Sequence, residues 1–158
     1  MIFVTVGTHY QGFERLIKKM DEIAAKINDE VIMQIGHTNY HPRNAKWFSF
    51  LEKENDILQL YKDSEIVVAH GGAGTLLTAL ILNKKLIIVP RLKRYKEHID
   101  NQQFELARLL ERNKQALCVY DINMLEEKIK NAKTLPIIQQ QRKNDLVDFI
   151  SKYIEEIN

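Results

Sequence analysis

The chain has little cysteine and no long apolar run. Its 158 residues contain one cysteine and no stretch of ~18 uninterrupted apolar residues that could span a membrane. An internal disulfide is therefore excluded, and we expect Cys118, in the apolar stretch ALCVY, to be a small core residue in a reducing cytoplasm. The opening residues MIFVTVG lack the basic flank and long apolar core of a secretory signal, so we expect only peripheral membrane contact.

An excess of one charge is also lacking. Lys and Arg number 23 and Asp and Glu number 21, which leaves a net charge of +2. A nucleic-acid-binding protein would carry a strongly basic face, and a disordered tail would carry a block of like charges. Because the length is typical of one core, we expect residues 1–158 to form a single domain.

Short apolar runs alternate with segments of helical period along the whole chain. Runs rich in Val and Ile predict strands at Ile2–Val6, Val31–Ile35, Ile66–Ala69, Leu86–Val89 and Ala116–Val119, with a weaker one at Trp47–Phe50. Apolar spacing of three and four predicts helices at Phe13–Ile27, Asp56–Lys62, Ala73–Leu82, Asp100–Arg112 and Asn123–Ala132. This alternation indicates an α/β fold with a Rossmann-like, open, mostly parallel sheet and helices on both faces. Ligands of such sheets bind at the carboxyl ends of the strands, near the point where strand order reverses.

The segment HGGAGT follows one predicted strand and precedes a predicted helix. Its glycines, Gly71, Gly72 and Gly74, allow tight turning and a close approach of the backbone to a ligand. The free amides of the helix start, together with the Thr75 hydroxyl, suit a phosphate. The alternative is a plain strand-to-helix turn whose glycines serve close packing, which leaves the polar His70 without a purpose.

Two common phosphate sites are excluded by what this segment lacks. A P-loop needs a lysine directly before the Ser or Thr, and a dinucleotide fingerprint needs a small residue where Leu77 stands. ATPases, dehydrogenases and UDP-sugar epimerases are therefore disfavoured.

A second polar segment, PRLKRYKEHIDNQQ, follows the next predicted strand. Its amides and carboxylate could cap a helix, or they could bind the hydroxyls of a sugar beside the phosphate site. Its basic residues could bind an acceptor diphosphate or anionic lipid heads, or form a solvated loop. These basic residues are Arg91, Lys93, Arg94 and Lys96.

These segments resemble a known family. The stretches FVTVGTH, VVAHGGAGT, LIIVPR and EHIDNQQFELA are similar to the C-terminal, donor-binding domain of glycosyltransferase family 28. Within it, the chain resembles the catalytic subunit of the split dolichyl-diphosphate-GlcNAc UDP-GlcNAc transferase and bacterial exopolysaccharide and capsule glycosyltransferase subunits. The resemblance implies the C-terminal half of a GT-B glycosyltransferase.

The resemblance also implies roles for individual residues. The turn from Gly72 to Thr75 would hold the diphosphate of a UDP-sugar. The general base should be a histidine or a carboxylate, for which His9 is the best candidate on this chain, and the alternative is a base from a partner subunit. One departure is Thr78, which stands where many members carry a ribose-binding glutamate. The residues expected to bind the donor are Gly7, Thr8, Gly36, His70, Gly71, Gly72, Ala73, Gly74, Thr75, Arg91, His98, Asp100, Asn101, Gln102 and Gln103.

The implied function is that of a UDP-sugar-binding, catalytic subunit of a two-component inverting glycosyltransferase. It would transfer a hexose or N-acetylhexosamine to a lipid-diphosphate-linked sugar in polysaccharide or glycan assembly. A membrane-anchored partner would bind that acceptor and hold this subunit at the inner membrane face, and the predicted helix at 138–158 would pack on the sheet or contact the partner. The chain has no Asp-x-Asp motif, so no metal or other cofactor is expected, and a zinc site at His37 and His41 is disfavoured. The alternative is a non-catalytic nucleotide-sugar-binding regulatory or scaffold subunit.

Overall fold

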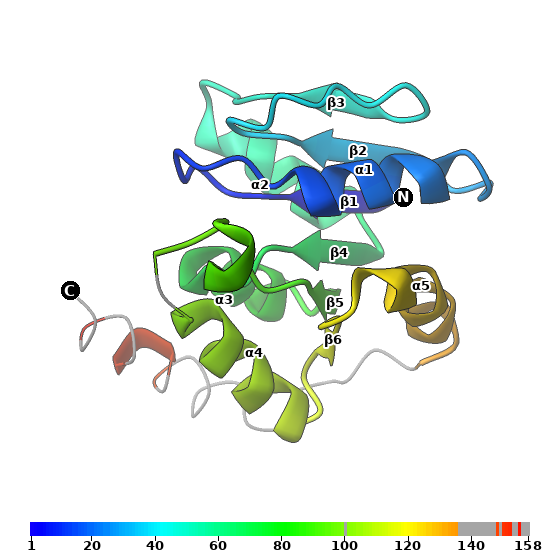
Figure 1. Cartoon of the computed structure of the whole chain (residues 1–158). Coiled ribbons are helices and arrows are strands. Elements are labelled where there is room, and N and C mark those ends of the chain that lie inside the picture. The colour runs from blue at the N-terminus through cyan, green and yellow to red at the C-terminus, as the bar shows by residue number, and fades with distance from the viewer. Residues whose placement is uncertain (100, 136–147, 149, 153–154, 156–158) are drawn as a thin grey trace.

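A single parallel sheet organises the chain. The computed structural model describes residues 1–99, 101–135, 148, 150–152 and 155. Six strands pair in the order β3-β2-β1-β4-β5-β6, and all neighbours are parallel (Figure 1). The strands are β1 (Ile2–Thr5), β2 (Val31–Gln34), β3 (Lys46–Phe48), β4 (Ile66–Ala69), β5 (Lys85–Ile88) and β6 (Leu117–Cys118).

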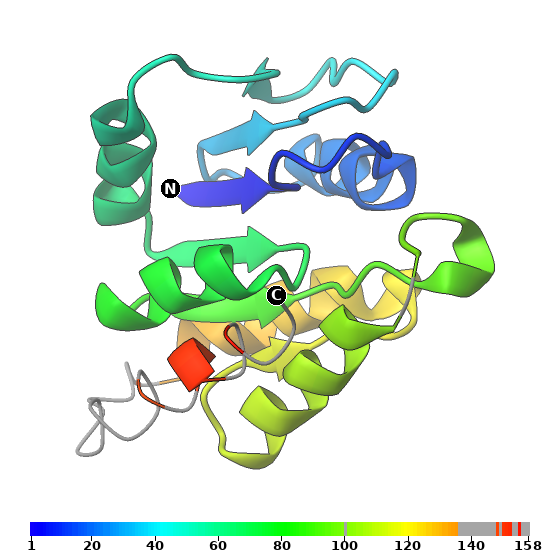
Figure 2. The same cartoon turned by 90° about the vertical axis from the view of Figure 1, so that its left-hand side faces the viewer.

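Helices cover both faces of this sheet. They are α1 (Glu14–Ala24), α2 (Glu54–Asp63), α3 (Ala73–Ile81), α4 (Gln102–Arg112) and α5 (Leu125–Thr134), with short 3-10 turns η1 (Lys93–Tyr95) and η2 (Ile122–Met124). Figure 2 shows α3 in front of the sheet and α5 behind it. Parallel strands need crossover connections, and right-handed crossovers place their helices on opposite faces when the strand order proceeds in opposite directions, as it does here from β1 and from β4.

Side-chain alternation along each strand divides the core into two apolar clusters. In β1, Ile2 and Val4 belong to the cluster beneath α1 and α5, whereas Phe3 belongs to the cluster beneath α2, α3 and α4. Each face is thus sealed by apolar residues, which explains why the strands read as nearly continuous apolar runs.

A buried acid on α1 fixes the long loop after β2. The carboxylate of Asp21 accepts hydrogen bonds from the Tyr40 hydroxyl (2.7 Å) and from the backbone amides of Arg43 (3.0 Å) and Asn44 (2.7 Å). Burial raises the pKa of Asp21, but these hydrogen bonds outweigh burial and leave the pKa below its ordinary value. The ionised carboxylate therefore holds the loop that carries His37 and His41.

The predicted fold class is confirmed. Every predicted strand and helix up to residue 135 has a counterpart, and boundaries move by a few residues, as where Trp47–Phe50 becomes Lys46–Phe48. Most of the predicted helix at 138–158 lies outside the described residues, although Ile150 is buried in the second cluster. None of the helices in the described chain is both long and apolar enough to cross a membrane.

Candidate functional site

The strand order reverses between β1 and β4. The chain proceeds from β1 to β2 and β3 on one side and from β4 to β5 and β6 on the other. The loops that leave the carboxyl ends of β1 and β4 therefore diverge to opposite faces of the sheet and leave a crevice between them. These loops are the segments that begin at Val6 and His70.

A cavity of about 620 Å³ opens at this point. Its size is typical of small-molecule sites. It lies between the carboxyl ends of the central strands and the helices α2 and α3, and each of these elements contributes to its lining. The strands β1 and β2 and the loop after β1 contribute Thr5, Gly7, Thr8 and Gln34. Helix α2 and the loop before it contribute Phe50, Leu51, Glu54, Asn55, Ile57, Leu58 and Tyr61. The glycine-rich segment and α3 contribute His70, Gly72, Ala73, Gly74, Thr75 and Thr78.

The imidazole of His70 lies between two glycines. A Cβ on Gly72 would lie 2.3 Å from the His70 Nε2 atom, and a Cβ on Gly7 would lie 2.6 Å from its Cε1 atom. Gly7 and Gly72 are therefore required by the buried ring, irrespective of any ligand. This contact explains why a histidine precedes the glycines.

The remaining glycines of the loop have separate purposes. Gly71 has a φ of +92° and packs against the Gln103 side chain, where a Cβ would approach to 3.1 Å. Gly74 has no heavy atom within 4 Å of an added Cβ, so it faces the open cavity. Of the glycines in this turn, Gly74 alone leaves room for a ligand to approach the backbone directly.

His70 is neutral and has a defined tautomer. Burial, together with the charge of Arg91, lowers the pKa of His70 to about 3. Its Nδ1 lies 3.3 Å from the Thr5 carbonyl oxygen, which can only accept, so Nδ1 carries the proton. The lone pair of Nε2 is therefore located between Gly7 and Gly72, at the cavity.

The start of α3 offers unpaired amides to the same cavity. The first helical hydrogen bond joins the Leu76 amide to the Gly72 carbonyl (3.0 Å), so the amides of Ala73, Gly74 and Thr75 precede the helical ladder. Gly72 is the N-cap and supplies no side chain. These amides and the positive end of the helix dipole favour an anion here.

Tyr61 was not predicted and supports the loop from α2. It hydrogen-bonds to the Thr75 side chain, and its ring packs edge-on against Phe3 at a centroid distance of 5.2 Å. Burial raises the pKa of Tyr61 to about 12, so it stays protonated. Its place on a short helix with apolar spacing gave no sign of this role.

None of the described residues predicted from the segment after β5 lines the cavity. Gln103 is buried and its Oε1 accepts the Arg91 amide (3.2 Å), so it joins the end of β5 to the glycine turn. Asn101 and Gln102 are exposed at the start of α4. Asp100 lies outside the described residues. Of the described residues predicted for donor binding, Gly36, Gly71, Arg91, His98, Asn101, Gln102 and Gln103 lie outside the cavity lining.

Arg91 is a buried structural residue. Its guanidinium donates to the carbonyls of Val6 (3.0 Å), Gln11 (2.9 Å), Gly12 (3.0 Å) and Glu97 (3.2 Å). Burial lowers its pKa to about 10, so the group remains charged at neutral pH. Its side chain therefore joins the loops after β1 and β5.

His9 follows Thr8 in the loop after β1 and is itself outside the cavity lining. Its ring stacks on Tyr10 at a centroid distance of 4.5 Å and lies 4.9 Å from the ring of His98. Burial first, then the charges of Arg91 and His98, lower its pKa, so it is neutral at pH 7. The Gln11 amide donates to its Nδ1 (3.2 Å), which places the proton of the neutral ring on Nε2.

The residues singled out in the loop after β2 lie outside the lining of this cavity. Gly36 has a φ of +54°, and a Cβ there would lie 2.9 Å from the Gly7 carbonyl oxygen, so it brings two loops together. His37 lies against Phe50, and His41 stacks on Trp47 at 4.6 Å. Among the described residues there is no group of three His, Cys, Asp or Glu side chains that could hold a metal.

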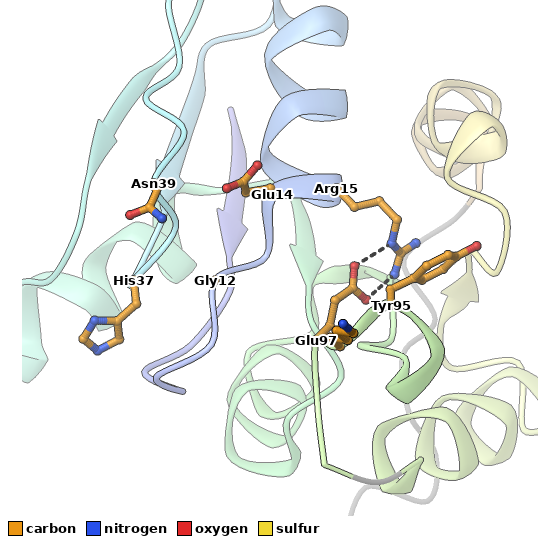
Figure 3. A pocket seen from close by; sticks show the side chains of 8 residues that line it. Gly12, Glu14, Arg15, His37, Asn39, Tyr95 and Glu97 are labelled. Atoms are coloured by element: carbon orange, nitrogen blue, oxygen red, sulfur yellow. Dashed lines mark hydrogen bonds and ion pairs between the residues drawn. The ribbon is translucent and has the colours of Figure 1, made fainter.

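A second cavity of about 380 Å³ lies on the other side of the loop after β1. Figure 3 shows Glu97 turned toward Arg15, with the Tyr95 ring beside the guanidinium and with His37 and Asn39 across the opening. The Arg15 and Glu97 side chains form two hydrogen bonds, of 2.8 and 2.9 Å. Arg15 and Glu97 thus neutralise one another in this cavity, which Glu14 and Lys96 also line.

The chain is similar to a known protein family. Residues 1–154 match the model of the glycosyltransferase family 28 C-terminal domain. The chain belongs to this family. Its site accordingly lies in a family 28 C-terminal domain, and its fold is that of the C-terminal half of a GT-B glycosyltransferase.

Solved structures resemble this family 28 domain at low sequence identity. CalG4, the calicheamicin glycosyltransferase, has a TM-score of 0.63 and 12% identity over 98% of this chain and 38% of that chain. UDP-glucose:anthocyanidin 3-O-glucosyltransferase in complex with UDP has a TM-score of 0.60 and 11% identity over 98% and 35%. MurG of Acinetobacter baumannii has a TM-score of 0.53 and 17% identity over 95% and 49%. The chain therefore spans less than half the length of each. A comparison with curated protein sequences gives no match.

Proposed function

We propose that this chain binds the UDP-sugar donor of an inverting glycosyltransferase and that a second subunit presents the acceptor. The observation that carries the proposal is the cavity at the β1–β4 crevice, where Gly74 and the free amides of α3 face open space. Membership of family 28 supports a donor-binding role. One structural neighbour of the same fold is described as a complex with UDP.

The diphosphate would bind at the start of α3. The amides of Ala73 to Thr75 would donate hydrogen bonds to the diphosphate oxygens. His70 would gain a proton at Nε2 and donate it in a hydrogen bond to one of these oxygens. During transfer an acceptor hydroxyl attacks the anomeric carbon, the bond from that carbon to the diphosphate oxygen breaks, and UDP leaves from the opposite face. Fixed amides stabilise the charge that develops on the leaving diphosphate, and this requires no metal.

The nucleoside would lie toward α2. Phe50, Leu51 and Leu58 form an apolar side of the cavity suited to a flat base, and Glu54 adds a carboxylate to the same cavity. Thr78, which replaces the usual acid, donates its hydroxyl to the Gly74 carbonyl (3.0 Å). Glu54 is therefore the carboxylate that we assign to the ribose hydroxyls, since ionised acceptors bind hydroxyls more strongly than neutral ones.

The acceptor would be a lipid-diphosphate-linked sugar held by a membrane-anchored partner, which would keep this chain at the cytoplasmic membrane face. His9, with its proton on Nε2, would donate a hydrogen bond at the cavity edge. A general base needs a free lone pair, and the lone pair of His9 is used by Gln11. We therefore assign the base to the partner, in place of His9.

A non-catalytic donor-binding subunit is the second candidate, favoured by the absence of a free lone pair on His9. Calorimetric titration with UDP, UDP-glucose, UDP-galactose and UDP-GlcNAc tests the binding step, and ADP serves as the control nucleotide. The release of UDP from the bound UDP-sugar, measured after membranes from the source cell are added, separates the catalytic subunit from the non-catalytic one. Binding without any release would support the non-catalytic subunit, and preference for ADP would contradict both.

A further inference from the structure

Two loops at the carboxyl edge of the sheet expose unusual apolar surface. The three most exposed large apolar side chains among the described residues are Tyr10 (66%), Ile99 (64%) and Tyr95 (50%). Tyr10 belongs to the loop after β1, and the other two belong to the loop after β5. The loops are in contact, since the Gln11 side-chain amide donates to the Lys96 carbonyl (3.2 Å) and the rings of His9 and His98 lie 4.9 Å apart.

Three basic residues flank the exposed apolar side chains of the loop after β5. Lys93, Arg94 and Lys96 are exposed, and in the described part of the chain none of them forms an ion pair. The nearby carboxylate of Glu97 is buried and bound to Arg15 (2.8 Å), so it does not neutralise them at the surface. Whereas the whole chain carries a net charge of only +2, this surface concentrates positive charge.

The surface is formed before any partner binds. Arg91 joins both loops through carbonyls of Val6, Gln11 and Glu97, and the Leu92 amide donates to the Glu97 carboxylate (3.1 Å). Lys96 has a φ of +57°, which turns the chain sharply after η1. Figure 2 shows η1, in light green, beyond the arrowheads of the strands, and all three of its residues are exposed.

We propose that Tyr10 and residues 93–99 form a docking surface for an anionic phospholipid bilayer. Tyrosine rings favour the depth of the lipid head groups, and lysine and arginine beside them gain from the negative surface potential of an anionic leaflet. The alternation of aromatic and basic side chains favours a lipid surface over an acidic protein, whose recognition would not require exposed Tyr95 and Ile99. This chain would thus touch the membrane itself and not only through a partner.

The place of the docking surface also bears on the proposed function. This consequence rests on that function, whereas the docking itself does not. The cavity and the docking surface lie at the same edge of the sheet, because both are built from loops that follow the strands. Docking would hold the donor beside the bilayer in which a lipid-linked acceptor resides.

The test is binding of the full chain to vesicles without nucleotide. We expect binding to phosphatidylcholine vesicles that contain about 30% phosphatidylglycerol, weaker binding to phosphatidylcholine alone, and a loss in high salt. Lys93→Gln with Arg94→Gln should lower the partition coefficient about 25-fold, at about fivefold per charge. The matched control, Lys62→Gln with Lys114→Gln, removes two exposed charges near the ends of α2 and α4, at the opposite edge of the sheet, and should change binding less than about twofold.

A second readout follows insertion of the ring itself. Tyr95→Trp in a Trp47→Phe background places the only tryptophan on the docking surface, and its emission should shift to shorter wavelength with anionic vesicles. Equal binding to both vesicle types, equal loss in the two charge-variant pairs, or an unshifted tryptophan would overturn the proposal. Absence of vesicle binding would overturn it too and would point to an acidic protein surface as the partner. Nucleotide titrations without vesicles report separately on the proposed function.

Discussion

At the scale of single residues, the glycines of the HGGAGT turn divide into two groups. Gly72, together with Gly7 of the first loop, makes room for the His70 ring, whereas Gly74 faces open space. Neighbouring glycines of one turn can therefore serve different purposes, one of them packing. The distinction predicts opposite outcomes for two substitutions in one turn.

Gly72→Ala should destabilise the protein, because the added Cβ would overlap the buried His70 ring. Gly74→Val should leave the melting temperature nearly unchanged, because its side chain enters open space. It should lower the affinity for UDP about tenfold or more, the equivalent of one hydrogen bond to a charged group. Thermal unfolding and calorimetric titration of both variants check this. A stable Gly74→Val protein with unaltered affinity would show that the diphosphate binds elsewhere.

His70 should take up a proton when a UDP-sugar binds. Its pKa in the free protein is about 3, so it is neutral at pH 7, and a bound diphosphate raises the pKa by placing negative charge at Nε2. Affinity should then fall as pH rises through the pKa of the complex. The binding enthalpy of UDP-glucose, whose diphosphate does not titrate near pH 7, should differ between phosphate and Tris buffers. The difference should vanish in His70→Gln, and equal enthalpies in the native protein would contradict the role of His70.

At the scale of elements, buried charges anchor the loops that follow the strands. Arg91 joins the loops after β1 and β5, and Asp21 joins α1 to the loop after β2. Neither group lines the main cavity, and both decide where the lining residues lie. Their loss should appear first as a loss of stability.

Arg91→Lys should lower the free energy of unfolding by about 2 to 4 kcal/mol, because an ammonium cannot reproduce the planar set of donors that binds four carbonyls. Arg94→Lys is the matched control, since Arg94 is exposed, and should change stability by less than about 0.5 kcal/mol. Urea unfolding measures both. Similar small effects in the two variants would contradict the anchoring role of Arg91.

Asp21→Asn should cost about 2 to 3 kcal/mol, since a neutral amide replaces a carboxylate that accepts several hydrogen bonds. The folded pKa of Asp21 is lowered, so its contribution is complete above the ordinary value of about 3.9 and is lost as pH falls through the folded pKa. The stability difference between native protein and variant should therefore shrink in acid. Glu22→Gln, an exposed change on the same helix, controls for charge, and a difference that is constant with pH would contradict this account.

At the scale of the whole molecule, the sequence predicted the fold well because the fold depends on periodicity. Uniform apolar runs indicated strands covered on both faces, and the alternation with helices indicated parallel pairing. The turn from His70 to Thr75 could be placed at a ligand crevice for the same reason. The family resemblance, carried by four short motifs, is confirmed over residues 1–154.

The orientation of individual side chains could not be predicted in this way. Arg91 and Gln103 lie in polar loops, yet both side chains turn inward to bind backbone groups. Tyr61 and Glu54 reach the cavity from α2, the helix that precedes β4, and no local pattern marks such a contact. These positions depend on how loops pack against one another, which is a property of the assembled sheet.

The most direct measurement is a titration of the ¹⁵N-labelled chain with UDP, followed by amide NMR shifts. We expect saturable shifts at Gly72 to Thr75 and around Leu51 and Glu54, with a dissociation constant below about 1 mM, or roughly 4 kcal/mol of binding free energy. All these residues belong to this chain, so we expect the shifts in the absence of a partner. A folded protein whose amides in these segments do not move at about 5 mM UDP would contradict the central claim.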